Sequence, residues 1–399
     1  MKNKRSFRIN LQKRFQKTIC CVLATFFTCV SLSIPAFSEE AVPIDAQAGQ
    51  FDCKSAILME ASTGAILFEQ NAEEALPPAS VTKVMTLLLV MEAIRDGKLG
   101  YDDMVTASAH ACSMGGSQIY LEEGEQMTVE DMIKSVVIAS ANDAAVALAE
   151  HIAGTEEAFV NRMNERAAEL SMANTHFENT NGLDDTVSNH VTSAKDIAIM
   201  SRELLRYEKI TEYSSIWMDT IRNGEFGLTN TNRLVRFYNG ATGLKTGSTA
   251  KAGFCVSATA ERGGMELICV IMAAPSRDIR NAAATSLLDW GFANYAICEQ
   301  SGGQIEPIPV VGGVQSVCNA SYEAFRTVLN KSDQNKIHSS VELPERLTAP
   351  VEKGQKIGEI VYTLNGQEIG RIPVTAEETI EEIGFWDVIL GLLKTISSC

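Results

Sequence analysis

The sequence predicts an α+β protein followed by a separate β-rich domain. Three patterns indicate this: a β-hairpin near residue 60, long helical patterns between residues 80 and 206, and three strands with a following helix between residues 245 and 295. From residue 300 the chain changes to short β-like runs separated by Gly and Pro. The chain has 399 residues, of which 45% are hydrophobic and 21% charged, enough for about two domains with packed cores.

Residue spacing and helix-start signals place the first elements. A hairpin is predicted over 54–70 and a helix over 80–96, which ends at a glycine. A second helical region starts at the capping-box-like sequence Thr128-Val129-Glu130-Asp131. It breaks near Ser140 and resumes over 144–152.

The same signals place the later elements. A helix capped near Ser193 runs to about residue 206. Strand patterns fill 245–274, with a turn at Arg262-Gly263-Gly264, and a helix covers about 276–295. The β-like runs of the second domain are 305–311, 342–347 and 357–364, and the turn sequence Asn365-Gly366 follows the last of them.

Residues 1–38 predict a secretory signal peptide. Seven Lys or Arg residues and no acidic residue precede an apolar run from Ile19 to Ile34, and Ala36-Phe37-Ser38 offers small residues for cleavage. The apolar run is shorter than the ~20 residues of a bilayer span. An uncleaved N-terminal anchor is the alternative. The rest of the chain divides into a first domain over 39–299, a β-rich domain over 300–376 and a tail over 377–399.

The tail is amphipathic from Ile380 to Cys399. Gly384, Asp387 and Gly391 belong to one polar stripe, and apolar residues occupy most of the remaining surface. This pattern predicts a helix that lies in the membrane interface, although it carries no basic stripe. The alternative is a terminal helix that packs on its own protein.

Charge and cysteine usage exclude several classes of function. The formal net charge of −16 argues against a nucleic-acid partner, because phosphate binding needs a basic face. Ten cysteines are present, three of them within residues 1–38. The others are scattered with no C-x-x-C pair, so their spacing indicates neither a disulfide framework nor a zinc site.

Ser80 and Lys83 form the first of three chemical motifs. A serine hydroxyl needs an adjacent base to act as a nucleophile, and helix positions i and i+3 face the same way. Burial and neighbouring cations can lower the pKa of a lysine enough for it to accept a proton. Pro77 and Pro78 place Ser80 near a helix N-terminus, where backbone N–H groups favour negative charge. The pattern alone is weak, because Ser248 and Lys251 match it too.

The second and third motifs supply polar groups from other elements. Ser140 and Asn142 sit at the predicted helix break, where a turn would point a hydroxyl and an amide into a cleft. Lys245-Thr246-Gly247 begins a strand pattern, which suits an extended ligand that ends in a carboxylate. The backbone N–H of Ser248 would join that of Ser80 in an oxyanion hole. Each string alone is more simply a turn or a strand end, but the three in this order indicate one site. We expect the Ser80 hydroxyl to lie within hydrogen-bonding reach of the Lys83 and Lys245 amines, with the Ser140 side chain opposite.

With these motifs the sequence resembles the low-molecular-mass penicillin-binding proteins that are serine-type D-alanyl-D-alanine carboxypeptidases. The resemblance covers nearly the whole chain after the signal peptide. It also rests on the following strings: Ala61-Ser62-Thr63-Gly64, Pro77-Pro78-Ala79-Ser80, Asn181-Gly182-Leu183, Asn230-Thr231-Asn232-Arg233, Gly243-Leu244-Lys245-Thr246-Gly247 and Ser276-Arg277-Asp278-Ile279-Arg280. It implies a β-lactamase/transpeptidase-like fold, in which an antiparallel sheet is flanked by helices and an inserted helical subdomain carries Ser140. A β-sandwich-like domain follows.

The resemblance also implies roles for these residues. Ser80 would be the nucleophile, Lys83 its base and Ser140 a proton relay. Substrate binding is implied for Asn142, Lys245, Thr246, Gly247, Ser248 and Arg280. The side chain of Ser248 departs from the larger residue that the family often has there, so its role is expected through its N–H. His190 falls in a loop that the family folds under the active site, where a structural or solvated role is expected.

The implied function is a D,D-carboxypeptidase that acts on cell-wall peptidoglycan. Ser80 would attack the bond between two D-alanines of a stem peptide, and water would then hydrolyse the acyl-enzyme. This mechanism implies no metal and no organic cofactor. β-Lactam antibiotics would be covalent inhibitors, and the enzyme would work outside the cell, peripheral on the outer face of the bacterial cytoplasmic membrane. Three alternatives stay open: a D,D-endopeptidase or a β-lactamase that uses the same site, and a non-catalytic wall scaffold.

Overall fold

The computed structural model describes residues 49–389 except 186 and 387. The predicted signal peptide and residues 390–399 of the predicted tail therefore lie outside the described residues. Within the described part of the chain, no helix is both long enough and apolar enough to cross a bilayer.

The first part of the chain alternates strands and helices, as the patterns predicted. Its strands and helices are β1 (Ser55–Glu60), β2 (Ile66–Gln70), η1 (Ala79–Thr82), α2 (Lys83–Arg95), β3 (Met104–Thr106), α3 (Ala109–Cys112), β4 (Gln126–Thr128), α4 (Val129–Ile138), α5 (Asn142–Ala153), α6 (Glu156–Glu169), α7 (Ala194–Leu205), α8 (Glu208–Ser214), β5 (Met218–Ile221), η2 (Arg222–Gly224), β6 (Phe226–Thr229), α9 (Leu234–Phe237), β7 (Ala241–Thr249), β8 (Gly253–Arg262), β9 (Met265–Ala274) and α10 (Arg277–Asn294).

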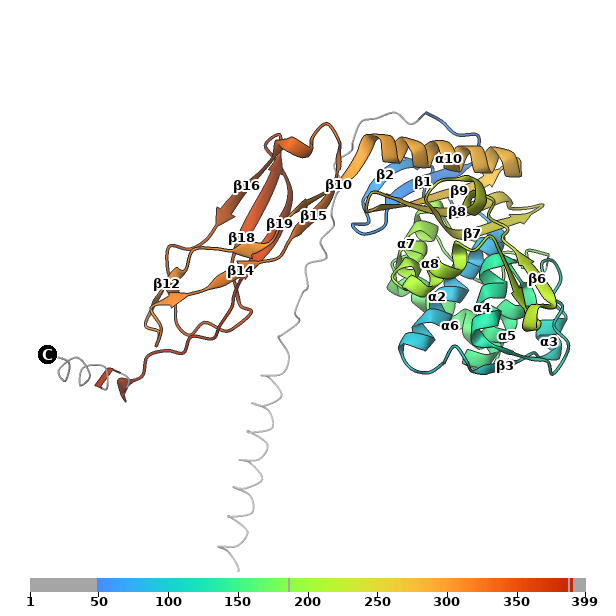
Figure 1. Ribbon diagram of the computed structural model, residues 1–399, viewed down its shortest axis with the longest axis horizontal. Helices are drawn as coiled ribbons and strands as arrows, with labels where there is room; N and C mark the ends of the chain where they lie inside the picture. Colours follow the sequence, from blue (N-terminus) through green and yellow to red (C-terminus); the bar gives the residue numbers. More distant parts are fainter. Residues whose placement is uncertain (1–48, 186, 387, 390–399) are drawn as a thin grey trace, which may run out of the picture. The chain divides into compact units, whose positions relative to one another are not determined.

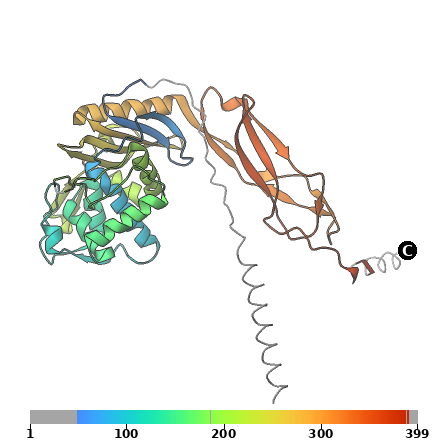
Figure 2. The ribbon, with the colours of Figure 1, turned by 180° about the vertical axis from the view of Figure 1, so that it is seen from behind.

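A five-stranded antiparallel sheet of order β2-β1-β9-β8-β7 is the centre of this part. Helix α10 covers one face of the sheet, and α2, α7 and α8 lie on the other together with α4, α5 and α6 (Figures 1 and 2). The predicted hairpin, the three-strand run and the C-terminal helix of this domain are confirmed. So is the predicted fold class, because helices flank an antiparallel sheet and a second group of helices, α4 to α6, is inserted before its last strands.

Alternation along the strands explains why both faces of the sheet are buried. In β1, Ile57 and Met59 belong to the core with the helical subdomain, whereas Ala56 and Leu58 belong to the core under α10. Side chains of successive strand residues point to opposite faces, so a strand with helices on both sides must be apolar throughout. Gly291 of α10 allows the helix to approach closely, since a Cβ there would lie 2.6 Å from Leu58.

Capping side chains fix the helix starts that the sequence predicted. Thr128 accepts a hydrogen bond from the Asp131 N–H (3.1 Å), Ser193 from that of Asp196 (3.1 Å) and Ser276 from that of Ile279 (3.2 Å). Each bond satisfies an N–H group that has no partner inside its own helix. The predicted helix break is confirmed as well: α4 ends at Ile138, α5 begins at Asn142, and Ser140 between them has φ +64°.

The second part of the chain is all β. Its strands are β10 (Tyr295–Gln300), β11 (Gly303–Gln304), β12 (Ile308–Val311), β13 (Val317–Cys318), β14 (Ala320–Tyr322), β15 (Phe325–Asn330), β16 (Ile337–Glu342), β17 (Leu347–Thr348), β18 (Lys356–Leu364) and β19 (Gln367–Ala376). A five-stranded sheet, β11-β14-β19-β18-β16, and a three-stranded sheet, β13-β12-β17, contribute to one apolar core. Asn365 and Gly366 both have positive φ at the β18–β19 turn, as their sequence predicted.

Candidate active site

Ser80 lies in a tight turn rather than in the first turn of the α-helix. η1 is a 3₁₀ turn that continues directly into α2, and the preceding Ala79 has φ +49°. Pro78 stands at the start of the turn and accepts a hydrogen bond from the Val81 N–H (3.2 Å). A left-handed conformation is costly for a residue with a Cβ, so neighbouring contacts must hold Ala79 in place.

Lys83 is fully buried and its Nζ atom lies 2.9 Å from the Ser80 Oγ atom. The same Nζ contacts two further oxygens, the Asn142 side-chain carbonyl at 2.6 Å and the Asn181 backbone carbonyl at 2.7 Å. Carbonyl oxygens only accept hydrogen bonds. A neutral amine that donates to both carbonyls therefore directs its lone pair at the Ser80 hydroxyl. The predicted proximity of Ser80 and Lys83 is confirmed.

The electrostatics of the site favour that neutral amine. Burial, and next the positive charge of Lys245, hold the pKa of Lys83 well below its usual value, while the Asp143 carboxylate opposes the shift. Desolvation penalises the charged form of a buried amine, and a second cation adds to this penalty. The arrangement can thus supply a base beside a nucleophile.

Asn142 is held in the orientation that Lys83 needs. Its Nδ2 donates to the Gly115 carbonyl (2.6 Å), which leaves its Oδ1 facing Lys83, and its backbone N–H donates to the Ser117 carbonyl (2.7 Å). Ser140 lies just before it, 4% exposed, and its hydroxyl has no hydrogen-bond partner among the residues that the structure describes. Its hydroxyl is therefore available to another group.

Strand β7 brings the third motif against the Ser80 turn. β7 is an edge strand of the sheet, and a Cβ on Gly247 would lie only 2.7 Å from the Ser80 backbone nitrogen. Lys245 is 1% exposed, and its Nζ donates to the Thr246 carbonyl (3.0 Å). Thr246 in turn donates its hydroxyl to Thr231 (2.8 Å).

Two expectations about lysines need correction or refinement. We expected the Ser80 hydroxyl to be in hydrogen-bonding reach of both Lys83 and Lys245, but within residues 49–389, apart from 186 and 387, only Lys83 bonds to it. Lys245 is turned along its own strand toward the Thr246 carbonyl and acts on Lys83 through its charge. The second S-x-x-K match has Ser248 and Lys251 exposed at the end of β7, outside any helix.

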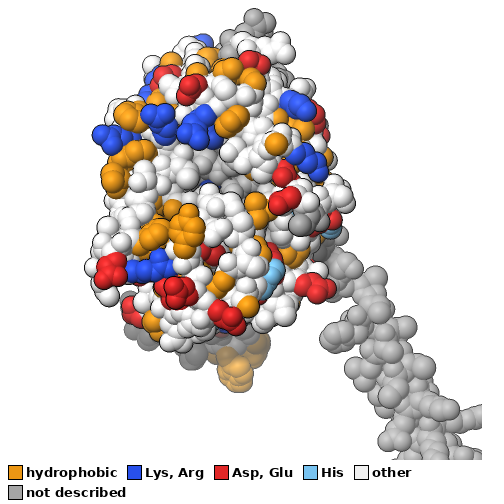
Figure 3. Space-filling model, turned by 90° about the vertical axis from the view of Figure 1, so that its right-hand side faces the viewer, with side chains coloured by type: hydrophobic (Ala, Val, Ile, Leu, Met, Phe, Trp, Pro, Cys, Tyr) orange, Lys and Arg blue, Asp and Glu red, His pale blue; other side chains and the backbone are white. Residues whose placement is uncertain are grey.

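Arg280 is buried at the start of α10, and its positive charge acts on Lys245. It donates to the Cys255 carbonyl (3.3 Å) on β8, in the residue pair opposite Gly247, and to the Asn281 side chain. Burial, and next the Arg280 charge, lower the pKa of Lys245 to about 7. Burial also lowers the pKa of Arg280 itself to about 10. Figure 3 shows one face of the molecule hollowed near its centre, with most Lys and Arg side chains to one side.

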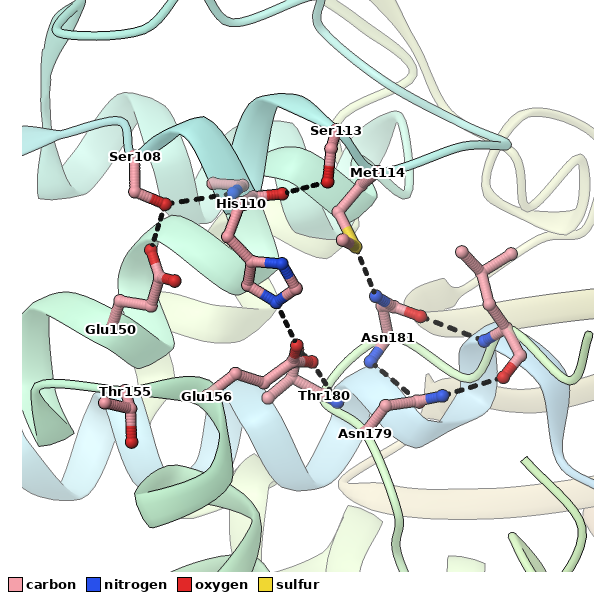
Figure 4. Close-up of polar contacts among 12 residues, drawn as sticks. Ser108, His110, Ser113, Met114, Glu150, Thr155, Glu156, Asn179, Thr180 and Asn181 are labelled. Carbon is pink, nitrogen blue, oxygen red and sulfur yellow. Dashed lines mark hydrogen bonds and ion pairs between the residues drawn. The ribbon is translucent and has the colours of Figure 1, made fainter. Parts of the chain in front are cut away.

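The loop around Asn181 is the part of the site that residue patterns alone did not assign. Figure 4 shows Asn179, Thr180 and Asn181 tied to their surroundings. The Glu156 carboxylate accepts bonds from the Thr180 N–H (3.0 Å) and hydroxyl (2.7 Å), and the Thr180 carbonyl accepts from Thr86 (2.6 Å). Because the partner of Lys83 here is a backbone carbonyl, no side-chain type marks it; only the string Asn181-Gly182-Leu183 signalled the loop.

A cavity of about 390 Å³ lies beside this loop and is separate from the Ser80 turn. It is lined by His110, Glu150, Thr155, Glu156, Glu157, Val160, Asn161 and Glu178. None of the predicted catalytic residues lines it, so the chemistry is not placed there. Among the described residues no group of three or more His, Cys, Asp or Glu side chains is arranged to hold a metal ion.

The site places a serine beside a buried lysine and next to an edge strand that carries a second buried lysine. This arrangement is suited to nucleophilic acyl transfer. Residues 42–276 match the family described as D-alanyl-D-alanine carboxypeptidase, and residues 300–382 match the penicillin-binding protein 5 C-terminal domain. The first match alone covers more than half of the chain. The chain belongs to the D-alanyl-D-alanine carboxypeptidase family of penicillin-binding proteins.

Relatives and solved structures agree with this assignment. D-alanyl-D-alanine carboxypeptidase DacF of Bacillus subtilis is 42% identical over 341 residues, which are 84% of this chain and 87% of the relative. DacC of Escherichia coli is 34% identical over 86% of this chain and 89% of its own length. Penicillin-binding protein 5 of Haemophilus influenzae has a TM-score of 0.77 at 32% identity, covering 85% of this chain and 100% of that one. A Listeria monocytogenes penicillin-binding protein in its ampicillin-bound form has a TM-score of 0.56 at 31% identity, covering 61% and 98%.

Proposed function

We propose that this chain is a serine D,D-carboxypeptidase that removes the terminal D-alanine from peptidoglycan stem pentapeptides. Ser80 is the nucleophile and Lys83 its base. The observation that carries the proposal is the buried Lys83 Nζ atom, which lies 2.9 Å from the Ser80 Oγ atom and contacts two carbonyl oxygens that can take its N–H bonds. Its depressed pKa keeps it able to accept the serine proton.

In the acylation step Ser80 Oγ attacks the carbonyl carbon between the two D-alanines, and its proton passes to Lys83. The N–H groups of Ser80 and Ser248 stabilise the oxyanion, since the Ser80 turn lies directly against β7 at Gly247. The C–N bond then breaks, and the amine of the terminal D-alanine takes a proton through Lys83 and Ser140. In the second step water attacks the ester with Lys83 as base, which frees Ser80.

The positively charged side of the site binds the substrate carboxylate. Lys245 and Thr246 lie on the edge strand, where a peptide bound in extended form runs alongside. Arg280, behind the strand, adds a second buried charge. Among the residues that the structure describes, neither Lys245 nor Arg280 forms an ion pair with a carboxylate. Two such buried cations are costly to keep charged, and an anionic ligand relieves that cost.

The proposal is tested with a pentapeptide that ends in D-Ala-D-Ala and with a fluorescent penicillin. We expect Ser80→Ala to lose both D-alanine release and covalent labelling. Lys251→Ala, in the other S-x-x-K match, is the control and should keep both. Labelling of the Ser80→Ala variant would contradict the assignment, and wild-type protein that neither labels nor releases D-alanine would be a scaffold. Release from cross-linked dimers alone would make it an endopeptidase, and rapid penicillin turnover a β-lactamase.

We further propose that a signal peptide exports the chain and that its C-terminal tail rests on the outer face of the cytoplasmic membrane. Supporting this, Phe385 and Trp386 are 73% and 71% exposed, and Ile383 and Val388 beside them are exposed too. Exposed apolar side chains next to an amphipathic segment favour an interfacial position. We expect Phe385→Ser/Trp386→Ser to abolish co-sedimentation with phosphatidylcholine–phosphatidylglycerol vesicles, and Val341→Ser, on β16, to leave it unchanged. Equal sedimentation of both would contradict the proposal.

A further inference from the structure

His190 is buried and joins the loop after Asn181 to the turn that carries Ser80. It is 4% exposed and packs edge-to-face on Phe177, with ring centroids 5.7 Å apart. Its Nδ1 lies 3.0 Å from the Glu178 backbone nitrogen and its Nε2 lies 2.7 Å from the Thr82 hydroxyl. Thr82 Oγ1 also bonds to the Ala79 carbonyl at 2.8 Å.

The donor and the acceptor of each hydrogen bond follow from the groups at its two ends. The Glu178 N–H can only donate, so Nδ1 is the acceptor and carries no proton. The neutral ring therefore has its proton on Nε2 and donates it to Thr82. The Ala79 carbonyl can only accept, so Thr82 donates to it. The result is one continuous chain from the Glu178 N–H through His190 and Thr82 to the carbonyl beside the nucleophile.

This carbonyl belongs to the most strained residue of the Ser80 turn. Ala79 has φ +49°, and its backbone is held from the other side by the same loop, because a Cβ on Gly182 would come within 1.9 Å of its oxygen. Strained backbone persists only where several contacts determine it. The loop that supplies the Asn181 carbonyl to Lys83 thus also fixes the turn before Ser80.

We propose that His190 is a positioning residue for the nucleophile: through the Thr82 hydroxyl it holds the Ala79 carbonyl and so sets the position of Ser80 against Lys83 and β7. The inference rests on the proposed function of Ser80. Burial lowers the pKa of His190 to about 4, which keeps the ring neutral near neutral pH. His190 touches no reacting atom, so its effect falls on the acylation rate and not on ligand binding.

The test compares acylation of the full chain by a fluorescent penicillin, resolved into the dissociation constant and the first-order acylation rate. His190→Phe keeps the aromatic packing but removes both hydrogen bonds, and Thr82→Val removes the hydroxyl at equal size. We expect each to lower the acylation rate by about 10- to 100-fold, the effect of displacing a reacting group by up to about 1 Å, with the dissociation constant within about threefold of wild type. Because His190 and Thr82 act through the same chain of hydrogen bonds, the acylation rate of the double variant should be no lower than that of the slower single variant.

Rescue and a matched control separate positioning from general destabilisation. His190→Gln offers one acceptor and one donor and should recover most of the rate, while His176→Phe, at an exposed histidine of the same loop, should change nothing. Thermal unfolding identifies a variant that does not fold, and Thr82→Val then carries the test. Wild-type rates in folded His190→Phe and Thr82→Val, multiplying effects in the double variant, or no rescue by glutamine would overturn the inference. The proposed function fails separately, when wild-type protein is not labelled or Ser80→Ala is.

Discussion

Replacing Gly247 by alanine tests how closely strand β7 must approach the nucleophile. The added Cβ would lie 2.7 Å from the Ser80 nitrogen, 2.8 Å from the Pro78 carbonyl and 2.9 Å from the Val81 nitrogen. All three neighbours are backbone atoms, so none can swing aside as a flexible side chain would. Gly247 has no left-handed φ, so space and not conformation is the constraint.

The expected loss of rate follows from the distance by which β7 and the Ser80 turn must separate. Bringing the contact with the Ser80 nitrogen to an ordinary 3.4 Å requires β7 and the turn to separate by about 0.7 Å. A displacement of this size between reacting groups costs roughly 10- to 100-fold in rate. Overpacking also lowers the free energy of unfolding by about 1–3 kcal/mol. The Ser80 N–H is itself a proposed oxyanion donor, so the loss should appear in acylation.

The assay is the second-order rate constant for labelling by a fluorescent penicillin, with thermal unfolding measured alongside. Gly227→Ala is the matched control: it is a strand glycine in β6 without a left-handed φ, and its Cβ would meet nothing within 4 Å. We expect normal labelling in the control. A folded Gly247→Ala that labels at the wild-type rate would refute the argument that this approach positions the site.

Two further predictions concern the charges of the site, both measured as kcat/KM for D-alanine release against pH. The value of kcat/KM should rise with pH as Lys83 loses its proton, and it should fall above about pH 7, where the free enzyme loses the Lys245 charge that binds the carboxylate. Lys245→Arg stays charged and should lose that alkaline fall. A wild-type profile that is flat from about pH 7 upward would contradict the role of Lys245. Arg280→Ala should raise KM and move the alkaline fall to higher pH, because the Arg280 charge depresses the pKa of Lys245. An alkaline fall at the wild-type pH would show that the two cations are not coupled.

Local signals were sufficient where one element decides the structure. The S-x-x-K spacing put Lys83 beside Ser80, and the caps at Thr128, Ser193 and Ser276 marked real helix starts. The helix break at Ser140 was also visible, because its residues interrupt an apolar helical pattern. Such features depend on contacts over a few residues, and sequence patterns report these directly.

Long-range contacts were the part that local patterns could not supply. The left-handed Ala79 carries no sequence mark, since alanine is an unexpected residue there and the loop around Gly182 and His190 holds it. The Asn181 carbonyl that contacts Lys83 is backbone and so has no side-chain signature. Lys245 was expected to bond to Ser80, but its burial along β7 directs it to its own strand, and that depends on how β7 and α10 pack.

The central claim is tested most directly by locating the covalent adduct that penicillin forms on the wild-type chain. Digestion and mass spectrometry should find one equivalent of acyl group on the peptide that contains Ser80, stable long enough to isolate. In Lys83→Met, where a side chain of similar length has no amine, the adduct should form far more slowly although the protein still folds. An adduct on any other residue, or undiminished acylation of the Lys83→Met variant, would contradict the account.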